Sequence, residues 1–135
     1  MLTSLEHMQI PVRHMDQAIS WYTEQLGFQL SSRDGDRIAF LTLPDGPLLM
    51  LWQTFEDSTY AHFTVNGTDF PVLLYRTIRI QELYERLTKL DTPIQLYQDE
   101  GFAWVLKFYD PEGNLWGVLQ FNPSSDKDDN NKSAT

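Results

Sequence analysis

The feature that most constrains this fold is an internal repeat. Residues 7–52 and 72–121 each run as a short apolar strand, an amphipathic helix and further strands interrupted by a Pro-containing turn. Pro44 and Pro111 occupy matching places, because Met50 follows the first and Gly117 the second by the same six residues. Repeated units of this kind each bury too little alone and share a core with their neighbour. The repeat therefore predicts a fold built from two similar halves.

Apolar periodicity predicts the same order of elements in each half. In the first half, the spacings predict a strand at 5–12, then a helix that ends near Gly27, then strands at 28–32, 37–43 and 47–53. In the second half, they predict a strand at 70–77, then a helix at 79–90, then strands at 94–98, 103–109 and 115–121. The predicted fold class is α+β, with two βαβββ modules.

Composition divides the chain further. We expect a first module at residues 1–53, a polar inter-module linker at 54–69 and a second module at 70–121. Residues 122–135 are almost free of apolar side chains, and such a segment cannot bury enough surface to order itself. We therefore expect a mobile polar tail there.

Charge and cysteine content exclude several classes of function. The net charge is −9, from 19 acidic and 10 basic side chains, which argues against nucleic acid as a partner. The chain has no Cys, which excludes disulfides, thiolate catalysis and Cys-based metal sites. We see neither a signal peptide nor an apolar run long enough for a membrane, so we expect a cytoplasmic protein with no membrane partner.

Four short motifs carry a family resemblance. They are His7 in an alternating strand, Ala18-Ile19-Ser20-Trp21-Tyr22 in the first helix, Leu26-Gly27-Phe28 after it, and Asp110-Pro111-Glu112-Gly113-Asn114 before the last strand. With these motifs, residues 5–121 resemble the vicinal oxygen chelate superfamily, which groups glyoxalase I, bleomycin-resistance proteins and extradiol dioxygenases. The resemblance implies a cupped, half-barrel mixed sheet with the helices outside.

The resemblance also implies four metal-ligand positions, one on the first and one on the last strand of each module. Carried over by position, they are His7, Met50, Val72 and Gly117. Only His7 suits a divalent metal, and catalytic sites of this kind need about three protein ligands. We therefore expect no metal and no other cofactor, and His7 is the only candidate for a catalytic residue.

Alternation along the strands predicts what lines the cup. Leu115 and Leu119 are expected to face inward, and Phe102 and Trp104 are expected at the mouth. The candidate ligand-binding residues are His7, Phe40, Met50, Trp52, Val72, Leu74, Phe102, Trp104 and Gly117. Two interpretations stay open: these side chains fill the cup as ordinary core, or Gly117 leaves space between Trp52 and Trp104 for a ligand.

The favoured hypothesis is a metal-independent binding protein like the bleomycin-resistance branch. It would sequester a small, flat, apolar or cationic molecule by aromatic stacking and cation–π contacts, and it would be a homodimer. One alternative is a lyase or dioxygenase of the same superfamily that uses His7 in an atypical site. Another is a structural or regulatory module whose cavity has lost its function.

Overall fold

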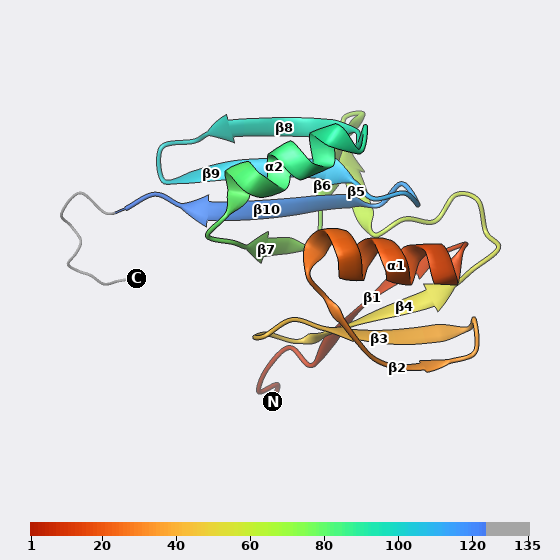
Figure 1. Cartoon of the computed structure of the whole chain (residues 1–135). Helices are drawn as coiled ribbons and strands as arrows, with labels where there is room; N and C mark the ends of the chain where they lie inside the picture. The colour runs from red at the N-terminus through yellow and green to blue at the C-terminus, as the bar shows by residue number, and fades with distance from the viewer. Residues whose placement is uncertain (124–135) are drawn as a thin grey trace.

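The computed structural model describes residues 1–123, and it contains two βαβββ modules (Figure 1). The first comprises β1 (His7–Val12), α1 (Met15–Leu26), β2 (Gln29–Asp34), β3 (Ile38–Thr42) and β4 (Leu48–Gln53). The second comprises β7 (Leu74–Arg76), α2 (Ile80–Lys89), β8 (Ile94–Asp99), β9 (Ala103–Tyr109) and β10 (Leu115–Phe121). The predicted α+β class with two such modules is confirmed.

The two sheets have the same topology. Their strand orders are β1-β4-β3-β2 and β7-β10-β9-β8, and in each the first strand is parallel to the last while the other pairs are antiparallel. Pro11 lies in β1, which pairs only with β4 at the edge of its sheet. An edge strand tolerates Pro because it has a side where no N–H is needed.

Strand register confirms the equivalence of the two halves. Gln9 pairs with Met50, and Leu74 pairs with Gly117. The residues two positions earlier, His7 and Val72, are therefore equivalent if the strands are continued. His7 belongs to β1, whereas Val72 lies in a bend just before β7.

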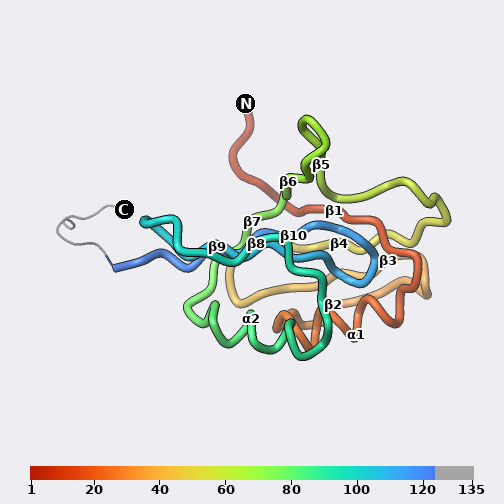
Figure 2. Tube along the Cα trace, turned by 90° about the horizontal axis from the view of Figure 1, so that it is seen from above, coloured from red at the N-terminus to blue at the C-terminus, as the bar shows by residue number. Residues whose placement is uncertain are grey.

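Both helices lie on one side of the sheets, and this side holds the core (Figure 2). Strand residues that point toward the helices are almost fully buried, including Ile10, Leu49, Leu51, Leu106 and Phe108. α1 ends because Gly27 adopts a left-handed conformation with φ of 84°, and its N–H donates to the Tyr22 carbonyl. The alternation expected from the sequence thus divides each sheet into a helix-covered face and an opposite face, here called the cup face.

An aromatic cluster on the helix side joins the modules. Tyr22 of α1 lies 5.2 Å from Trp116 of β10, measured between ring centroids, and Phe28 lies 5.9 Å from Tyr75 of β7. Tyr75 also stacks on Trp116 and its hydroxyl contacts Met8 Sδ of β1 at 3.7 Å. Because these rings come from both halves, the modules share a single core.

A buried hydrogen-bond network explains why the helix motif and the turn motif occur together. The Tyr22 hydroxyl donates to the Asp110 carboxylate and accepts from Trp116 Nε1 at 3.1 Å. Asn114 Nδ2 donates to the same carboxylate at 3.0 Å and to the Pro11 carbonyl at 3.1 Å. Burial raises the pKa of Asp110, and the hydrogen bonds from Tyr22 and Asn114 act in the opposite direction. The turn before β10 is thereby fastened to the first module.

The inter-module segment differs from the sequence-based expectation. A single strand at 70–77 was predicted after a polar linker, and this prediction is wrong. The chain instead forms a hairpin of β5 (His62–Val65) and β6 (Thr68–Pro71), and β7 follows in a different sheet. Asn66 and Gly67 both have positive φ, 50° and 81°, as a tight hairpin turn requires. Figure 2 shows this hairpin on the side of the sheets opposite to the helices.

The C-terminal tail predicted at 122–135 lies outside the described residues, apart from its first two. Asn122 is held in place, because its backbone N–H donates to the Phe102 carbonyl at 2.9 Å and its side chain to Asp99 at 2.8 Å. Within residues 1–123, no helix is long and apolar enough to span a membrane.

Candidate ligand-binding site

The cup face of the first module brings together several of the predicted residues. Phe40 pairs with Met50, and Met50 pairs with Gln9, so these three side chains form a row across β3, β4 and β1. Trp52 lies one step along the same face of β4, opposite Pro11. Trp52 is 37% exposed, and its Nε1 donates to Gln9 Oε1 at 2.6 Å. Met50 is only 8% exposed and Phe40 is half-buried, so the accessible apolar part of this face is mainly the oriented indole of Trp52.

An open depression lies beside Trp52. It has a volume of about 530 Å³, and it is bordered by β1, β4 and the segment 54–61. Glu56 and Tyr60 belong to this border, and the guanidinium of Arg13 lies over the Tyr60 ring, 5.3 Å from its centroid. The guanidinium of Arg37 lies over the Trp52 ring at 6.0 Å. The depression therefore combines aromatic side chains with charged groups of both signs.

In the second module the hairpin covers the cup face. The Tyr109 hydroxyl of β9 donates to Asp69 at 2.7 Å, and the backbone N–H of Leu115 donates to His62 Nδ1 at 3.1 Å. Lys107 Nζ lies 5.6 Å from the centroid of the Phe70 ring. These contacts come from one residue of β5 and two of β6, and they hold the hairpin against β9 and β10. The two cup faces are therefore not equivalent.

Gly117 does not open a space, and the expectation that it would is wrong. A Cβ built on Gly117 would fall far inside van der Waals contact with Leu74 Cδ2, and 3.1 Å from Pro71 Cγ. Pro71 is itself buried as the last residue of β6. The room left by the missing side chain is thus occupied by the hairpin end and by β7.

Two aromatic candidates lie away from the cup. Trp104 pairs with Gln120 and lies on the helix-covered face, with its ring centroid 5.0 Å from that of Tyr97. Its predicted place at the cup mouth is therefore wrong. Phe102 is 61% exposed at the β8–β9 turn, where it contacts the ring of Phe121 at 6.2 Å.

The remaining candidates lie near the meeting edges of the sheets. Val72 is 60% exposed and Leu74 is 56% exposed, so both present apolar surface to solvent. His7 lies at the start of β1, where its Nδ1 contacts the Glu6 carboxylate. The structure thus brings His7, Met50 and Leu74 to one side of the molecule, and separates them from Trp104.

The residues at the four family positions do not fit a divalent metal. His7 offers one imidazole, Met50 a thioether, and Val72 and Gly117 no ligand atom at all. Within residues 1–123, no three His, Asp or Glu side chains converge in a way that could hold an ion. A metal of the catalytic type needs about three such ligands. No reaction step is therefore assigned to a metal here.

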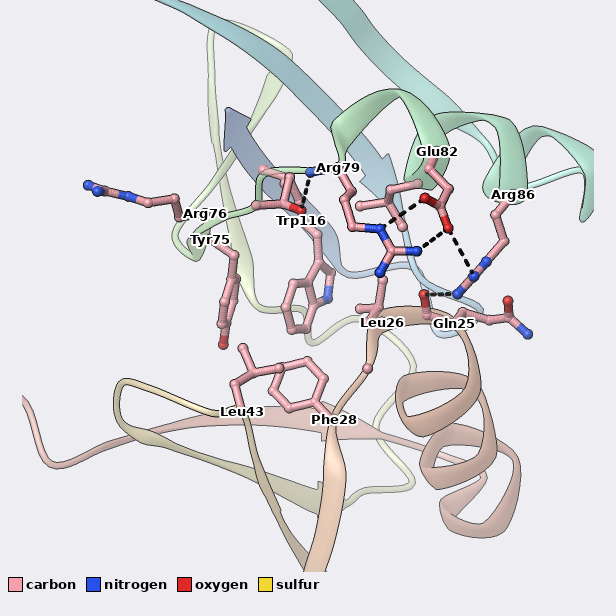
Figure 3. A pocket seen from close by; sticks show the side chains of 14 residues that line it. Gln25, Leu26, Phe28, Leu43, Tyr75, Arg76, Arg79, Glu82, Arg86 and Trp116 are labelled. Atoms are coloured by element: carbon pink, nitrogen blue, oxygen red, sulfur yellow. Dashed lines mark hydrogen bonds and ion pairs between the residues drawn. The ribbon is translucent and has the colours of Figure 1, made fainter. Parts of the chain in front are cut away.

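A pocket between the modules, on the helix side, was not predicted from the sequence. It has a volume of about 230 Å³ and lies between the end of α1, the start of α2 and β7 (Figure 3). Its walls include Phe28, Tyr75 and Trp116. One sequence feature could have indicated it. Arg79, Glu82 and Arg86 are spaced so that three charged side chains lie on one face of α2.

These charged side chains form a network at the pocket. Glu82 accepts from Arg79 Nε at 2.9 Å and from a second nitrogen of the same guanidinium, and it lies 3.9 Å from Arg86 Nη2. The hydrogen bonds from Arg79 lower the pKa of Glu82. Arg86 Nη1 also donates to the Gln25 carbonyl at the end of α1 at 3.5 Å, which links the two modules across the pocket.

Comparison with solved structures gives many matches of the same fold. TioX from Micromonospora sp. ML1 is 23% identical with a TM-score of 0.67, over 89% of this chain and 100% of that one. TnmS3, an antibiotic binding protein from Streptomyces sp. CB03234, is 20% identical with a TM-score of 0.69, over 90% of this chain and 98% of that one.

A resistance protein that holds a metal ion has the same fold. A mutant of FosX, the fosfomycin resistance protein from Listeria monocytogenes complexed with Mn(II), is 13% identical with a TM-score of 0.70, over 88% of this chain and 90% of that one. At these identities the matches show a shared fold. No curated protein matches the chain in sequence.

A family model decides the assignment. The model described as Glyoxalase/Bleomycin resistance protein/Dioxygenase superfamily matches residues 4–118, which is most of the chain. The matched range includes the first module, the second module as far as the middle of β10, and all four motifs on which the resemblance rested. The chain therefore belongs to the glyoxalase/bleomycin resistance protein/dioxygenase superfamily.

Proposed function

We propose that this protein is a metal-independent binding protein that sequesters a small, flat, apolar or cationic molecule on the cup face of the first module. The observation that carries this proposal is Trp52, a large indole that is 37% exposed and oriented by its hydrogen bond to Gln9. An indole face attracts both flat rings and cations. Glu56 borders the same depression, and the net charge of −9 of the chain favours a positive ligand over a negative one.

The chemistry of the neighbouring side chains supports binding more than catalysis. Met50 and Phe40 are apolar, and Met adapts to ligands of different shape. His7 has its imidazole beside Glu6, and no second candidate for acid–base work lies in the row formed by Phe40, Met50 and Gln9. The antibiotic binding of the structural relative TnmS3 agrees with this proposal.

A second copy of the chain would complete the site. Val72 and Leu74, just before and at the start of β7, are 60% and 56% exposed, and Phe63 of the hairpin is 49% exposed. Large exposed apolar side chains, when they gather in one patch, mark interaction surfaces. We therefore propose a homodimer in which a partner covers this surface. Replacing Val72 by Glu should shift the protein to monomer in analytical ultracentrifugation, while Leu90→Glu, at an exposed position after α2, should not.

Titration with a flat aromatic cation such as proflavine tests the ligand site. Removing the indole in Trp52→Ala should weaken binding by about tenfold, since aromatic and cation–π contacts each contribute on the order of 1 kcal/mol. Trp104→Ala is the matched control, because this ring lies on the other face, and it should bind as wild type. Equal loss in both variants would contradict the assignment of the site.

Metal independence is tested separately. Chelation with EDTA should change neither proflavine affinity nor melting temperature. About one equivalent of tightly held transition metal per purified chain would contradict this part of the proposal and favour an enzyme that uses His7.

A further inference from the structure

The inter-module pocket has a preformed aromatic wall. The rings of Tyr75 and Trp116 stack with centroids 4.8 Å apart, and Phe28 meets Trp116 edge-on at 6.0 Å. Trp116 is fixed further by its hydrogen bond to the Tyr22 hydroxyl. Because packing already holds these rings, a ligand would pay little conformational entropy to order them. The wall is suited to a flat hydrocarbon ring.

The rim of the pocket is positive in a protein that is strongly acidic. Arg79 and Arg86 share the single carboxylate of Glu82, which leaves a local charge of +1 against a net charge of −9 for the chain. Arg76 is not counted, because its guanidinium lies over the Phe121 ring at 4.7 Å and points away from the pocket (Figure 3). A local positive charge beside an apolar wall favours an anion with a hydrocarbon part.

Arg79 keeps hydrogen-bonding capacity for such an anion. The Arg79 guanidinium has five N–H donors, and it donates to the Glu82 carboxylate from Nε and Nη2. Among residues 1–123, no hydrogen bond occupies Nη1 of Arg79. Figure 3 shows this side chain extending from the start of α2 toward Leu26 at the end of α1. A carboxylate at the rim could therefore bond to Arg79 while its ring enters the pocket.

We propose that this pocket is a second ligand site, and that it takes a small single-ring aromatic carboxylate. The ring lies against Phe28 and Tyr75, and the carboxylate accepts from Arg79. The volume of about 230 Å³ is below the ~300–1,000 Å³ of common drug-sized sites, which limits the ligand to one ring. The site is on the helix side and prefers an anion, so it is independent of the cup-face site around Trp52.

Binding of benzoate, followed by proton–nitrogen NMR, tests this proposal. Benzoate should shift the backbone signals of Gly27, Thr77 and Val118, which line the pocket, and leave Gln9 unchanged. Benzamide has the same ring without the charge, and it should bind at least tenfold more weakly, corresponding to about 1.4 kcal/mol. Equal affinity for both probes would overturn the proposal.

Three variants sharpen the test. Arg79→Gln should weaken benzoate binding at least tenfold. Arg33→Gln, which breaks the ion pairs of β2 with Asp16 and Asp36 away from the pocket, should have no effect. Glu82→Gln should strengthen binding several-fold, because it removes the competing carboxylate. If Arg79→Gln and Arg33→Gln behave alike, or Glu82→Gln weakens binding, the proposal is overturned.

The cup-face variant separates the two proposals. Trp52→Ala should leave benzoate binding unchanged, whatever it does to proflavine binding. Benzoate shifts centred on Gln9 and lost in Trp52→Ala would overturn the second site while leaving the cup-face proposal intact. If proflavine fails to bind while benzoate binds normally, the cup-face proposal is overturned and the second site stands.

Discussion

Substitution of Gly117 tests how closely the hairpin packs on the second module. In Gly117→Ala the new Cβ would overlap Leu74 Cδ2 and lie 3.1 Å from Pro71 Cγ. The backbone itself accepts Ala, because Gly117 is not among the residues with positive φ. Leu74 Cδ2 ends an exposed side chain that can turn aside, but the ring of Pro71 is buried and cannot. Overpacking of this kind typically costs about 1–3 kcal/mol, and relief of the Gly entropy penalty offsets about 0.5–1 kcal/mol of it. We expect Gly117→Ala to lower the free energy of unfolding by about 1 kcal/mol.

A double-mutant cycle identifies the cause. Leu74 is 56% exposed, so Leu74→Ala alone should destabilise little. In the Gly117→Ala, Leu74→Ala double variant the overlap is relieved, and we expect a favourable coupling of about 0.5–1 kcal/mol. Urea unfolding followed by circular dichroism measures all four proteins. If Gly117→Ala raises stability and shows no coupling to Leu74, the position is open and this account of it is refuted.

Three further predictions concern the rest of the chain. Tyr22→Phe should lower the free energy of unfolding in urea by about 1–3 kcal/mol, because Asp110 and Trp116 Nε1 each lose a buried hydrogen-bond partner. Tyr84→Phe, on the partly exposed face of α2, should lower it far less. Hydrogen bonds from Tyr109 and Thr64 lower the pKa of Asp69 in the folded protein below its unfolded value of 3.8. The stability that ionised Asp69 contributes is therefore present above pH 3.8 and is lost as the pH falls toward the lower folded pKa. Asp69→Asn should flatten the acid side of the stability–pH curve, and an unchanged slope would contradict this. Truncation after Pro123, which spares the hydrogen bonds of Asn122, should leave stability within about 1 kcal/mol of the full chain, and a larger loss would show that the tail packs on the body.

Most of the fold could be predicted because it depends on local patterns. Strands β9 and β10 have the predicted bounds, since both are long apolar runs limited by clear turns. The β5–β6 hairpin was missed although Asn66-Gly67 marked a turn. Its strands have only four residues each, and they are held by distant partners such as Tyr109 that only the tertiary structure brings close.

The sequence placed one of the two expected cup-face Trp side chains on the correct face of its strand and the other on the wrong face. In β4 the phase set by Leu49 and Leu51 on the helix side correctly placed Trp52 on the cup face. In β9 the alternating set of Trp104, Leu106 and Phe108 is fully apolar, whereas the other set contains Lys107 and Tyr109, so periodicity pointed to the helix-covered face for Trp104. The expected place at the cup mouth rested instead on the nearness of Trp104 to the loop before β9. The inter-module pocket requires knowledge of how α1 and α2 approach each other, which no pattern within either half contains.

The hairpin gives the two halves of this repeat different surfaces. It covers the cup face of β9 and β10 through Asp69 and His62, whereas within residues 1–123 no hydrogen bond joins the hairpin to the row of Phe40, Met50 and Gln9. A ligand on one open sheet contacts protein on one side only, and a second copy placed over Val72 would supply the missing wall. Since a ligand held between two copies binds the dimer and not the monomer, it must stabilise dimerisation by mass action. Cup-face affinity and self-association are therefore coupled in the proposed function, whereas the inter-module pocket, built within one chain, should bind its ligand equally well in monomer and dimer.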